Sequence, residues 1–140
     1  MKWAALIAWV ATAGGGFLLL AIWLSRGGMR QEREAGRRIR PPLILGHFGL
    51  AATGLVLWII YVASDSDALA WVAFTLLAVV ALLGWTMFAI WYQRRRLGAA
   101  REAAGIPAEQ HFPVPVVALH GVLAVTTVVL VFLAALDVGS

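Results

Sequence analysis

Residues 68–92 read ALAWVAFTLLAVVALLGWTMFAIWY and contain no Asp, Glu, Lys or Arg over 25 positions. About 20 apolar residues of α-helix are enough to cross the hydrocarbon core of a bilayer, which is about 30 Å thick. Three further stretches of the chain are equally free of these charged residues: 3–24, 43–63 and 112–136. The pattern predicts an all-α membrane protein, a bundle of four transmembrane helices that run alternately up and down.

The composition of the whole chain agrees with this fold class. Of the 140 residues, 62% are hydrophobic and 13% are charged, whereas a typical soluble domain is about 45–50% apolar and about 25% charged. The length predicts a single domain over residues 1–140. The chain has no cysteine, which excludes disulfides, thiolate metal sites and covalent c-type haem attachment. The spans also hold no Ser-His-Asp set, phosphate loop or paired carboxylates, which argues against a hydrolase or phosphoryl-transfer enzyme.

The basic residues predict the orientation in the membrane. All of them except Lys2 lie in the loops 25–42 and 93–111. Short cytoplasmic loops are enriched in Lys and Arg, so both loops are expected in the cytoplasm, and both termini outside, in a bacterial inner membrane or a plasma membrane. The loops are also expected to contact anionic lipid, and nothing in them suggests a nucleic-acid partner.

The chain contains an internal repeat that relates residues 1–63 to residues 68–140. The sequence Ala-Ile-Trp at 21–23 recurs at 89–91, 68 positions later. We interpret the repeat as a duplicated αα-hairpin, whose two copies are related by an axis along the membrane normal. The alternative is chance similarity between apolar helices, which use few residue types.

Two histidines occupy matching positions of this repeat. His47 and His120 each follow a proline by five residues, after Pro42 and Pro115, and both fall inside a predicted span. An ionisable residue within a span indicates a functional site, and lipid offers no partner for an imidazole. Both rings are therefore expected to face the interior of the bundle, at one depth.

This pair of histidines predicts a haem b site, with one haem per chain. In an up-down bundle the second and fourth helices are diagonal, so His47 and His120 would approach the iron from opposite sides as its two axial ligands. Gly16 and Gly84 match each other in the repeat and are expected about one turn deeper, where they would let their helices approach the porphyrin edges. Taken on their own, these glycines are better explained by ordinary packing of small residues between helices.

Cations for the haem propionates are available in the two basic loops. The candidates are Arg38, Arg40, Arg94 and Arg95. Their alternative role is the topology signal itself. The third histidine, His111, has no counterpart in the first repeat, and it is expected to be a solvated residue at the membrane interface.

The layout of paired histidines in a four-helix bundle resembles the small transmembrane b-type cytochromes. That resemblance implies one-electron transfer on the cytoplasmic side, with a quinone or a redox protein of the membrane as partner, rather than a stand-alone enzyme. Di-haem members need four histidines and this sequence offers two within spans, so the resemblance implies at most one haem. A homo-oligomer is also compatible with so short a chain.

Other readings stay open at this point. The chain would otherwise be a structural or accessory subunit of a larger membrane complex, without a cofactor, in which the histidines bond only to neighbouring helices. Further uses are ligation of a chlorophyll-type pigment, a proton relay, and a small transporter made by oligomerisation.

Seven tryptophans are distributed along the spans. Those near the predicted helix ends are expected in aromatic belts at the membrane surface, and those deeper in the spans are expected to pack inside the bundle or against a cofactor. The first group comprises Trp3, Trp23, Trp71 and Trp91, and the second comprises Trp9, Trp58 and Trp85.

Overall fold

The computed structural model describes residues 1–33, 39–97 and 107–136. Each of its four long helices is long and apolar enough to cross a membrane, so the chain is a multi-pass integral membrane protein. Two short 3-10 helices, η1 and η4, lie in the two basic loops. The long helices are α1 (Lys2–Ser25), α2 (Pro41–Ser64), α3 (Asp67–Leu97) and α4 (Val114–Ala135), and the short ones are η1 (Gly28–Arg33) and η4 (Ala108–His111).

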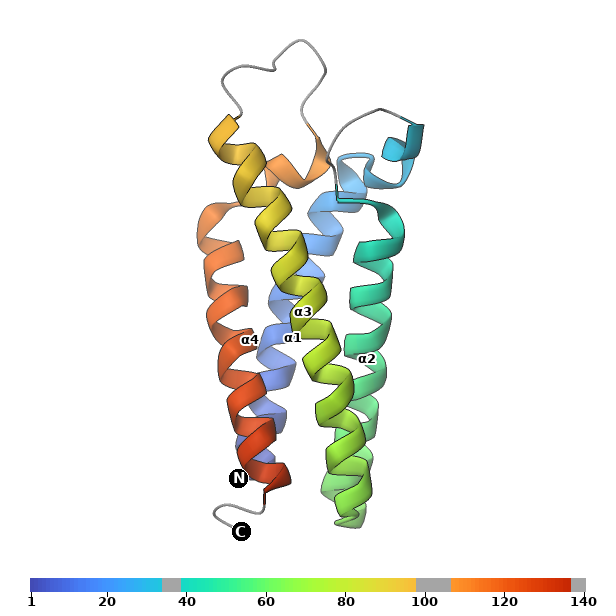
Figure 1. Ribbon diagram of the computed structural model, residues 1–140, viewed down its shortest axis with the longest axis vertical. Coiled ribbons are helices and arrows are strands. Elements are labelled where there is room, and N and C mark those ends of the chain that lie inside the picture. Colours follow the sequence, from blue (N-terminus) through green and yellow to red (C-terminus); the bar gives the residue numbers. More distant parts are fainter. Residues whose placement is uncertain (34–38, 98–106, 137–140) are drawn as a thin grey trace.

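The four long helices form one bundle in which each packs against its two neighbours (Figure 1). The most extensive contacts join α2 to α3 and α1 to α4, and smaller ones join α3 to α4 and α1 to α2. The helices α2 and α4 are therefore diagonal, and so are α1 and α3. This arrangement confirms the predicted all-α four-helix bundle.

The helix ends follow the local chemistry. Pro41 and Pro42 occupy the first turn of α2 after an extended Arg40, where a missing backbone N–H costs nothing. The turn between α2 and α3 places Asp65 in the left-handed region, with φ of 52°. The main difference from the predicted spans is α3, which continues to Leu97 and so carries three arginines on its last turn.

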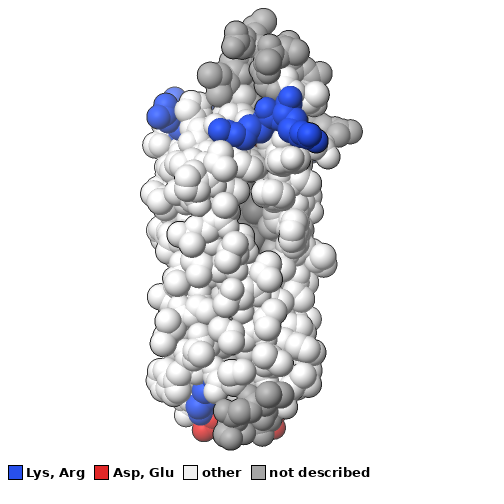
Figure 2. All heavy atoms as spheres, turned by 90° about the vertical axis from the view of Figure 1, so that its left-hand side faces the viewer, with Lys and Arg blue, Asp and Glu red and all other residues white. Residues whose placement is uncertain are grey.

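The two ends of the bundle differ in charge (Figure 2). We call the end where α1 and α3 finish the basic end, and the other end the turn end. At the turn end, Lys2 forms an ion pair with Asp65, which ties the start of α1 to the α2–α3 turn. Between the two ends, the face shown in Figure 2 is uncharged. The arginines of the basic end whose side chains the structure describes are Arg26, Arg30, Arg40, Arg94, Arg95 and Arg96.

Buried apolar side chains form two separate cores. The turn-end core centres on Trp9 and Trp58, whose ring centres are 6.3 Å apart. Gly54 makes room for it, because a Cβ there would lie 3.0 Å from the Trp9 ring. The basic-end core comprises Trp23, Ile39, Ile44, Trp91 and Ala108.

Candidate functional site

The histidines His47 of α2 and His120 of α4 face each other inside the bundle. Their ring centres are 6.5 Å apart and the ring planes are inclined by 65°. Both side chains are partly buried. The diagonal packing of α2 and α4 therefore brings together the two histidines that the sequence singled out.

Each imidazole is held by one backbone carbonyl of a neighbouring helix. His47 Nδ1 lies 3.0 Å from the carbonyl oxygen of Val80 on α3, and His120 Nδ1 lies 3.0 Å from that of Thr12 on α1. A carbonyl oxygen only accepts, so Nδ1 carries the proton and donates it in both rings. In the neutral tautomer this leaves the Nε2 lone pair of each ring free to bind a partner.

A glycine lies against each imidazole. A Cβ on Gly16 would lie 3.1 Å from Cε1 of His120, and a Cβ on Gly84 would lie 3.3 Å from Cε1 of His47. Contacts this short leave no room for a larger residue unless the ring moves. The glycines were expected about one turn deeper than the histidines; they lie level with them instead, because the backbones of α1 and α3 run directly past the rings.

The two halves of the site are related by the offsets of the sequence repeat. Thr12 and Val80 are 68 positions apart, as are Gly16 and Gly84, whereas the histidines are 73 positions apart. Each histidine contacts a helix of the other repeat, since His47 meets α3 and His120 meets α1. The site is thus built by both repeats together.

One polar contact breaks this symmetry. Thr12 Oγ1 and Thr127 Oγ1 are 2.9 Å apart, and Thr127 is completely buried. Each Oγ1 also lies 2.8 Å from a carbonyl oxygen of its own helix, at Ala8 and Leu123; since a hydroxyl has one proton, one threonine donates to the other and the second donates to its own carbonyl. The corresponding positions of the other half are Val80 and Gly54, which have no hydroxyl, so the neighbourhood of His120 is the more polar of the two.

The distance between the two ring centres can be compared with the distance expected when two imidazoles share one metal ion. With a metal–nitrogen bond of about 2.0–2.1 Å and about 1 Å more from nitrogen to ring centre, two imidazoles on opposite sides of one metal ion have ring centres about 6 Å apart. The observed 6.5 Å is close to this value. Contact between two aromatic rings also falls in the range of about 4.5–7 Å. The spacing therefore suits both a shared metal and direct ring contact.

The number of protein ligands available limits which kind of metal site the histidines could form. Among the described residues, no group of three or more His, Cys, Asp or Glu side chains is placed to hold a metal ion. A bare zinc ion needs three or four protein ligands. A haem iron needs only axial ligands from the protein, and two imidazoles are the set found here.

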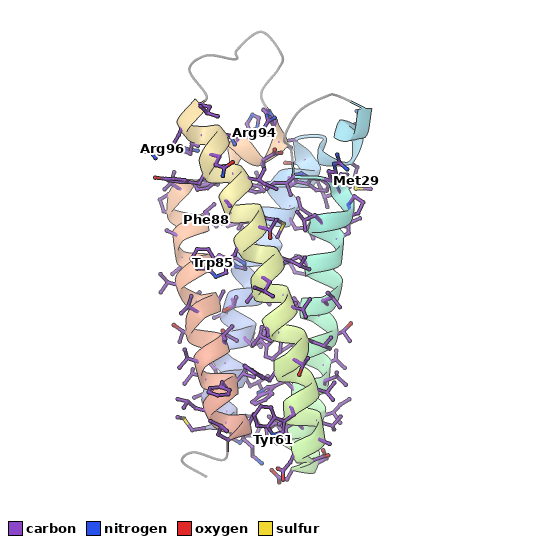
Figure 3. All side chains as sticks on the ribbon, in the orientation of Figure 1. Met29, Tyr61, Trp85, Phe88, Arg94 and Arg96 are labelled. Atoms are coloured by element: carbon purple, nitrogen blue, oxygen red, sulfur yellow. The ribbon has the colours of Figure 1, made fainter. Side chains whose placement is uncertain are left out.

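The predicted propionate ligands lie at the basic end, away from the imidazoles. Arg40 is exposed at the start of α2, and Arg94 and Arg95 lie on the last turn of α3. Figure 3 labels Arg94 near the top of the bundle. Arg95 places its guanidinium over the Trp91 ring, 5.4 Å from the ring centre. Arg38 lies outside the described residues.

The tryptophans differ from the sequence expectation. Trp23 and Trp91 were expected in membrane-surface belts, but they are 0% and 5% exposed and belong to the basic-end core. Trp85 was expected inside the bundle, but it is 62% exposed and packs edge-on against Phe88 on the outer face of α3 (Figure 3). Trp23 and Trp91 occupy matching positions of the sequence repeat, at 21–23 and 89–91, but nothing in that match marks them as buried.

Buried polar atoms without a partner gather at the basic end. Within the described part of the chain they include Nε1 of Trp23, Nε1 of Trp91, Oε2 of Glu109 and Nδ1 of His111. Such atoms are rare in folded proteins, and each needs an explanation. His111, expected to be solvated, thus has one ring nitrogen shielded from solvent.

Glu109 was not singled out by the sequence, and it holds η4 in place. Its side chain is 0% exposed. Its Oε1 accepts a hydrogen bond from the backbone N–H of Ile39, at 3.3 Å, and the next residue, Gln110, donates to the carbonyl of Trp91 at 3.4 Å. These bonds close the basic end over Trp91.

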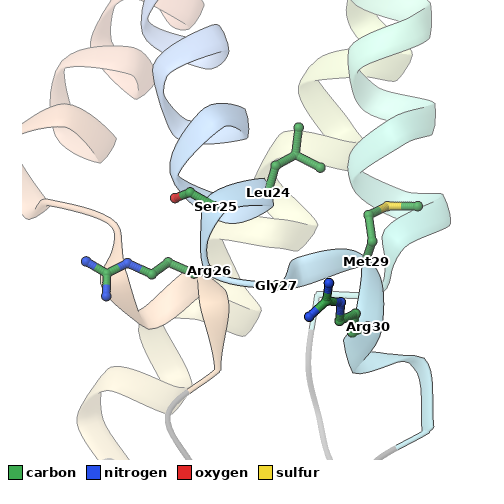
Figure 4. A pocket seen from close by; sticks show the side chains of 6 residues that line it. All are labelled: Leu24, Ser25, Arg26, Gly27, Met29 and Arg30. Atoms are coloured by element: carbon green, nitrogen blue, oxygen red, sulfur yellow. The ribbon is translucent and has the colours of Figure 1, made fainter.

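A surface hollow lies at the end of α1, apart from the histidines (Figure 4). It includes the Gly27 turn, where the backbone has φ of 77°. Its volume is about 540 Å³, but it opens to solvent and has no contact with either imidazole. It is lined by Leu24, Ser25, Arg26, Gly27, Met29 and Arg30.

Comparison with known proteins places the chain in no family. No protein-family model matches it, and neither a curated protein nor a solved structure matches it.

Proposed function

We propose that the protein is a membrane b-type cytochrome that binds one haem through His47 and His120. The observation that carries the proposal is the pair of rings 6.5 Å apart on diagonal helices, each with Nδ1 donating to a backbone carbonyl. Histidines that bind metals usually donate their other N–H to a carbonyl or carboxylate, which orients the ring and raises the basicity of the ligand nitrogen. When bound, the haem supplies one-electron transfer between ferric and ferrous iron.

The chain's own residues orient and shield this site. Gly16 and Gly84 keep α1 and α3 close to the rings, and the bonds to Thr12 and Val80 hold both Nε2 atoms in one orientation. With both axial positions taken by histidine, the iron would have no open position for oxygen chemistry. Such a haem could serve one-electron transfer or haem sensing, and we propose one-electron transfer.

The proposed orientation places the basic end in the cytoplasm, following the distribution of arginines. His47 is the seventh residue of α2, so the site lies about 10 Å from that end of the helix. One haem in this leaflet does not cross a core about 30 Å thick. The haem would therefore exchange electrons with a quinone, with a second haem of a membrane partner, or with a cytoplasmic reductase.

Absorption spectroscopy tests the proposal. The protein is expressed with haem supplied, purified in mild detergent, and scanned oxidised and reduced. We expect Soret and α bands typical of two nitrogen ligands. His47→Ala and His120→Ala should each abolish these bands, while His111→Ala, which removes a histidine outside the spans, should keep them.

Two results would reject the proposal. One is a colourless wild-type protein that is folded by circular dichroism and elutes as a single species. The other is a set of bands that persists in both His47→Ala and His120→Ala.

A second candidate is a structural subunit in which the histidines only join helices. The observation that favours it is that each imidazole already bridges two helices through its bond to a carbonyl. In that case the purified protein stays colourless, co-migrates with a larger assembly, and loses stability in His47→Ala and His120→Ala.

A further inference from the structure

Two buried indole N–H groups, which lie nearer the basic end than the histidine pair, have no hydrogen-bond acceptor in the part of the chain that the structure describes. Trp23 on α1 and Trp91 on α3 are 0% and 5% exposed, and neither Nε1 has a hydrogen-bond partner among the described residues. A buried N–H that lacks an acceptor costs about 1–3 kcal/mol. Two such donors at equivalent positions of a repeat point to a ligand that offers two acceptors.

Helix geometry places both indoles on the same faces as the glycines of the histidine site. Trp23 follows Gly16 by seven residues, and Trp91 follows Gly84 by seven. Seven residues are about two turns, or about 10.5 Å toward the basic end, on one side of the helix. The Cα–Cβ bonds of both residues tilt toward the helix N-terminus, which is the direction of the histidines, and Gly28 beyond the end of α1 packs against the Trp23 ring from the other direction.

Apolar side chains connect the region of the two indoles with the region of the two histidines. The basic-end core includes both indoles, and Met87 and Val117 pack against it. Met87 lies one turn beyond Gly84, and Val117 lies one turn before His120. The indoles and the imidazoles therefore belong to one continuous stretch of the bundle interior.

We propose that the N–H groups of Trp23 and Trp91 bind the two propionate carboxylates of the haem, an inference that rests on the function proposed above. A porphyrin held by the diagonal histidines would lie across the line that joins them, with its edges toward α1 and α3. Its two propionates would extend from one edge and place their carboxylates roughly 7–9 Å from the iron, since about six bonds of about 1.5 Å separate them. Each indole would then donate to one carboxylate.

The charge at this end suits carboxylates. The Arg95 guanidinium lies over the Trp91 ring, so a cation sits beside one of the two donors. A hydrogen bond to a charged group is worth about 1.5–3 kcal/mol. Neutral donors buried beside a cation bind an anion without the cost of burying another charge.

Binding of haem and of haem dimethyl ester tests the inference, because the ester has the same iron and ring but no carboxylates. Both compounds are titrated into the full-length apoprotein, purified in detergent, for the wild type, Trp23→Phe, Trp91→Phe and the double variant. We expect each single change to weaken haem at least about tenfold, and the double change about a hundredfold, with a clearly smaller loss for the ester, whose carbonyl oxygens still accept a hydrogen bond but carry no charge.

The control variant is Trp85→Phe, which changes an exposed tryptophan of α3. It should leave both affinities unchanged. Equal losses for haem and ester in the Trp23 and Trp91 variants would mean that the indoles only fill space, and would overturn the inference. Unchanged haem binding would also overturn it. A wild-type protein that binds neither compound would instead reject the haem site itself.

Discussion

At the scale of single residues, the site depends on having glycine at two positions. Gly16 and Gly84 lie so close to His120 and His47 that a methyl group would touch the rings. Glycine in the middle of a helix costs up to about 1 kcal/mol relative to alanine. Close approach to the imidazoles accounts for glycine at both positions.

Replacing these glycines should displace the rings. Gly16→Leu and Gly84→Leu should each destabilise the bundle by about 1–3 kcal/mol, because the new side chain enters space that the imidazole fills. Haem content per protein should fall in parallel. Unfolding in SDS and the absorbance ratio of haem to protein measure the two effects.

Gly14→Leu is the matched control, because a Cβ at this position of α1 meets nothing within 4 Å. It should keep haem and be neutral or slightly more stable, since leucine is a better helix former. Equal effects of Gly14→Leu and Gly16→Leu would show that the contact with His120 is unimportant.

At the scale of elements, α1 and α4 are joined by the hydroxyl pair of Thr12 and Thr127. Thr127→Val keeps the shape and removes the hydroxyl. Hydrogen bonds between membrane helices average about 0.6 kcal/mol and reach about 1.7, so we expect a loss of stability in this range on unfolding in SDS.

Thr126→Val serves as the control for this change, because Thr126 is exposed and donates only to Val122 of its own helix. Its effect should be close to zero. If Thr126→Val destabilises as much as Thr127→Val, the bond between helices contributes nothing measurable.

The 3-10 helix η4 is the second element with a clear anchor. Glu109→Leu leaves the N–H of Ile39 without its acceptor, which should cost about 1–3 kcal/mol. Glu109→Gln keeps a side-chain oxygen in the same place and should be milder. Thermal unfolding in detergent separates the two variants, and equal losses would show that the charge of Glu109, which both changes remove, matters more than its acceptor.

At the scale of the whole molecule, the proposed orientation follows from charges that gather at one end of the bundle. The chain has no cysteine, so a single introduced thiol reports its own side of the membrane. Ser25 and Ser64 form a matched pair, because each is exposed on the last turn of its helix and bonds to a carbonyl of that turn.

A maleimide that does not cross membranes should label Ser64→Cys on intact cells and label Ser25→Cys only after permeabilisation. The physical reason is the retention of arginine-rich loops in the cytoplasm. The reverse pattern would place the basic end outside, and with it the proposed haem on the other side of the membrane.

The sequence alone determined the number of helices, the charged end, and the pair of histidines at one depth. These features depend on the spacing of charged residues and on the repeat, and both can be read along the chain. The prediction that His47 and His120 approach each other assumed diagonal helices, and the observed packing has that arrangement.

Only the tertiary structure decided which side of each helix faces inward. These helices are apolar all round, so no polar stripe marks the outer face. The sequence therefore placed Trp85 inside and Trp23 and Trp91 at the surface, whereas packing did the reverse. The tertiary structure also decided that each histidine bonds to a helix of the other repeat. That contact depends on how the two hairpins pack together and not on the order of residues within either one.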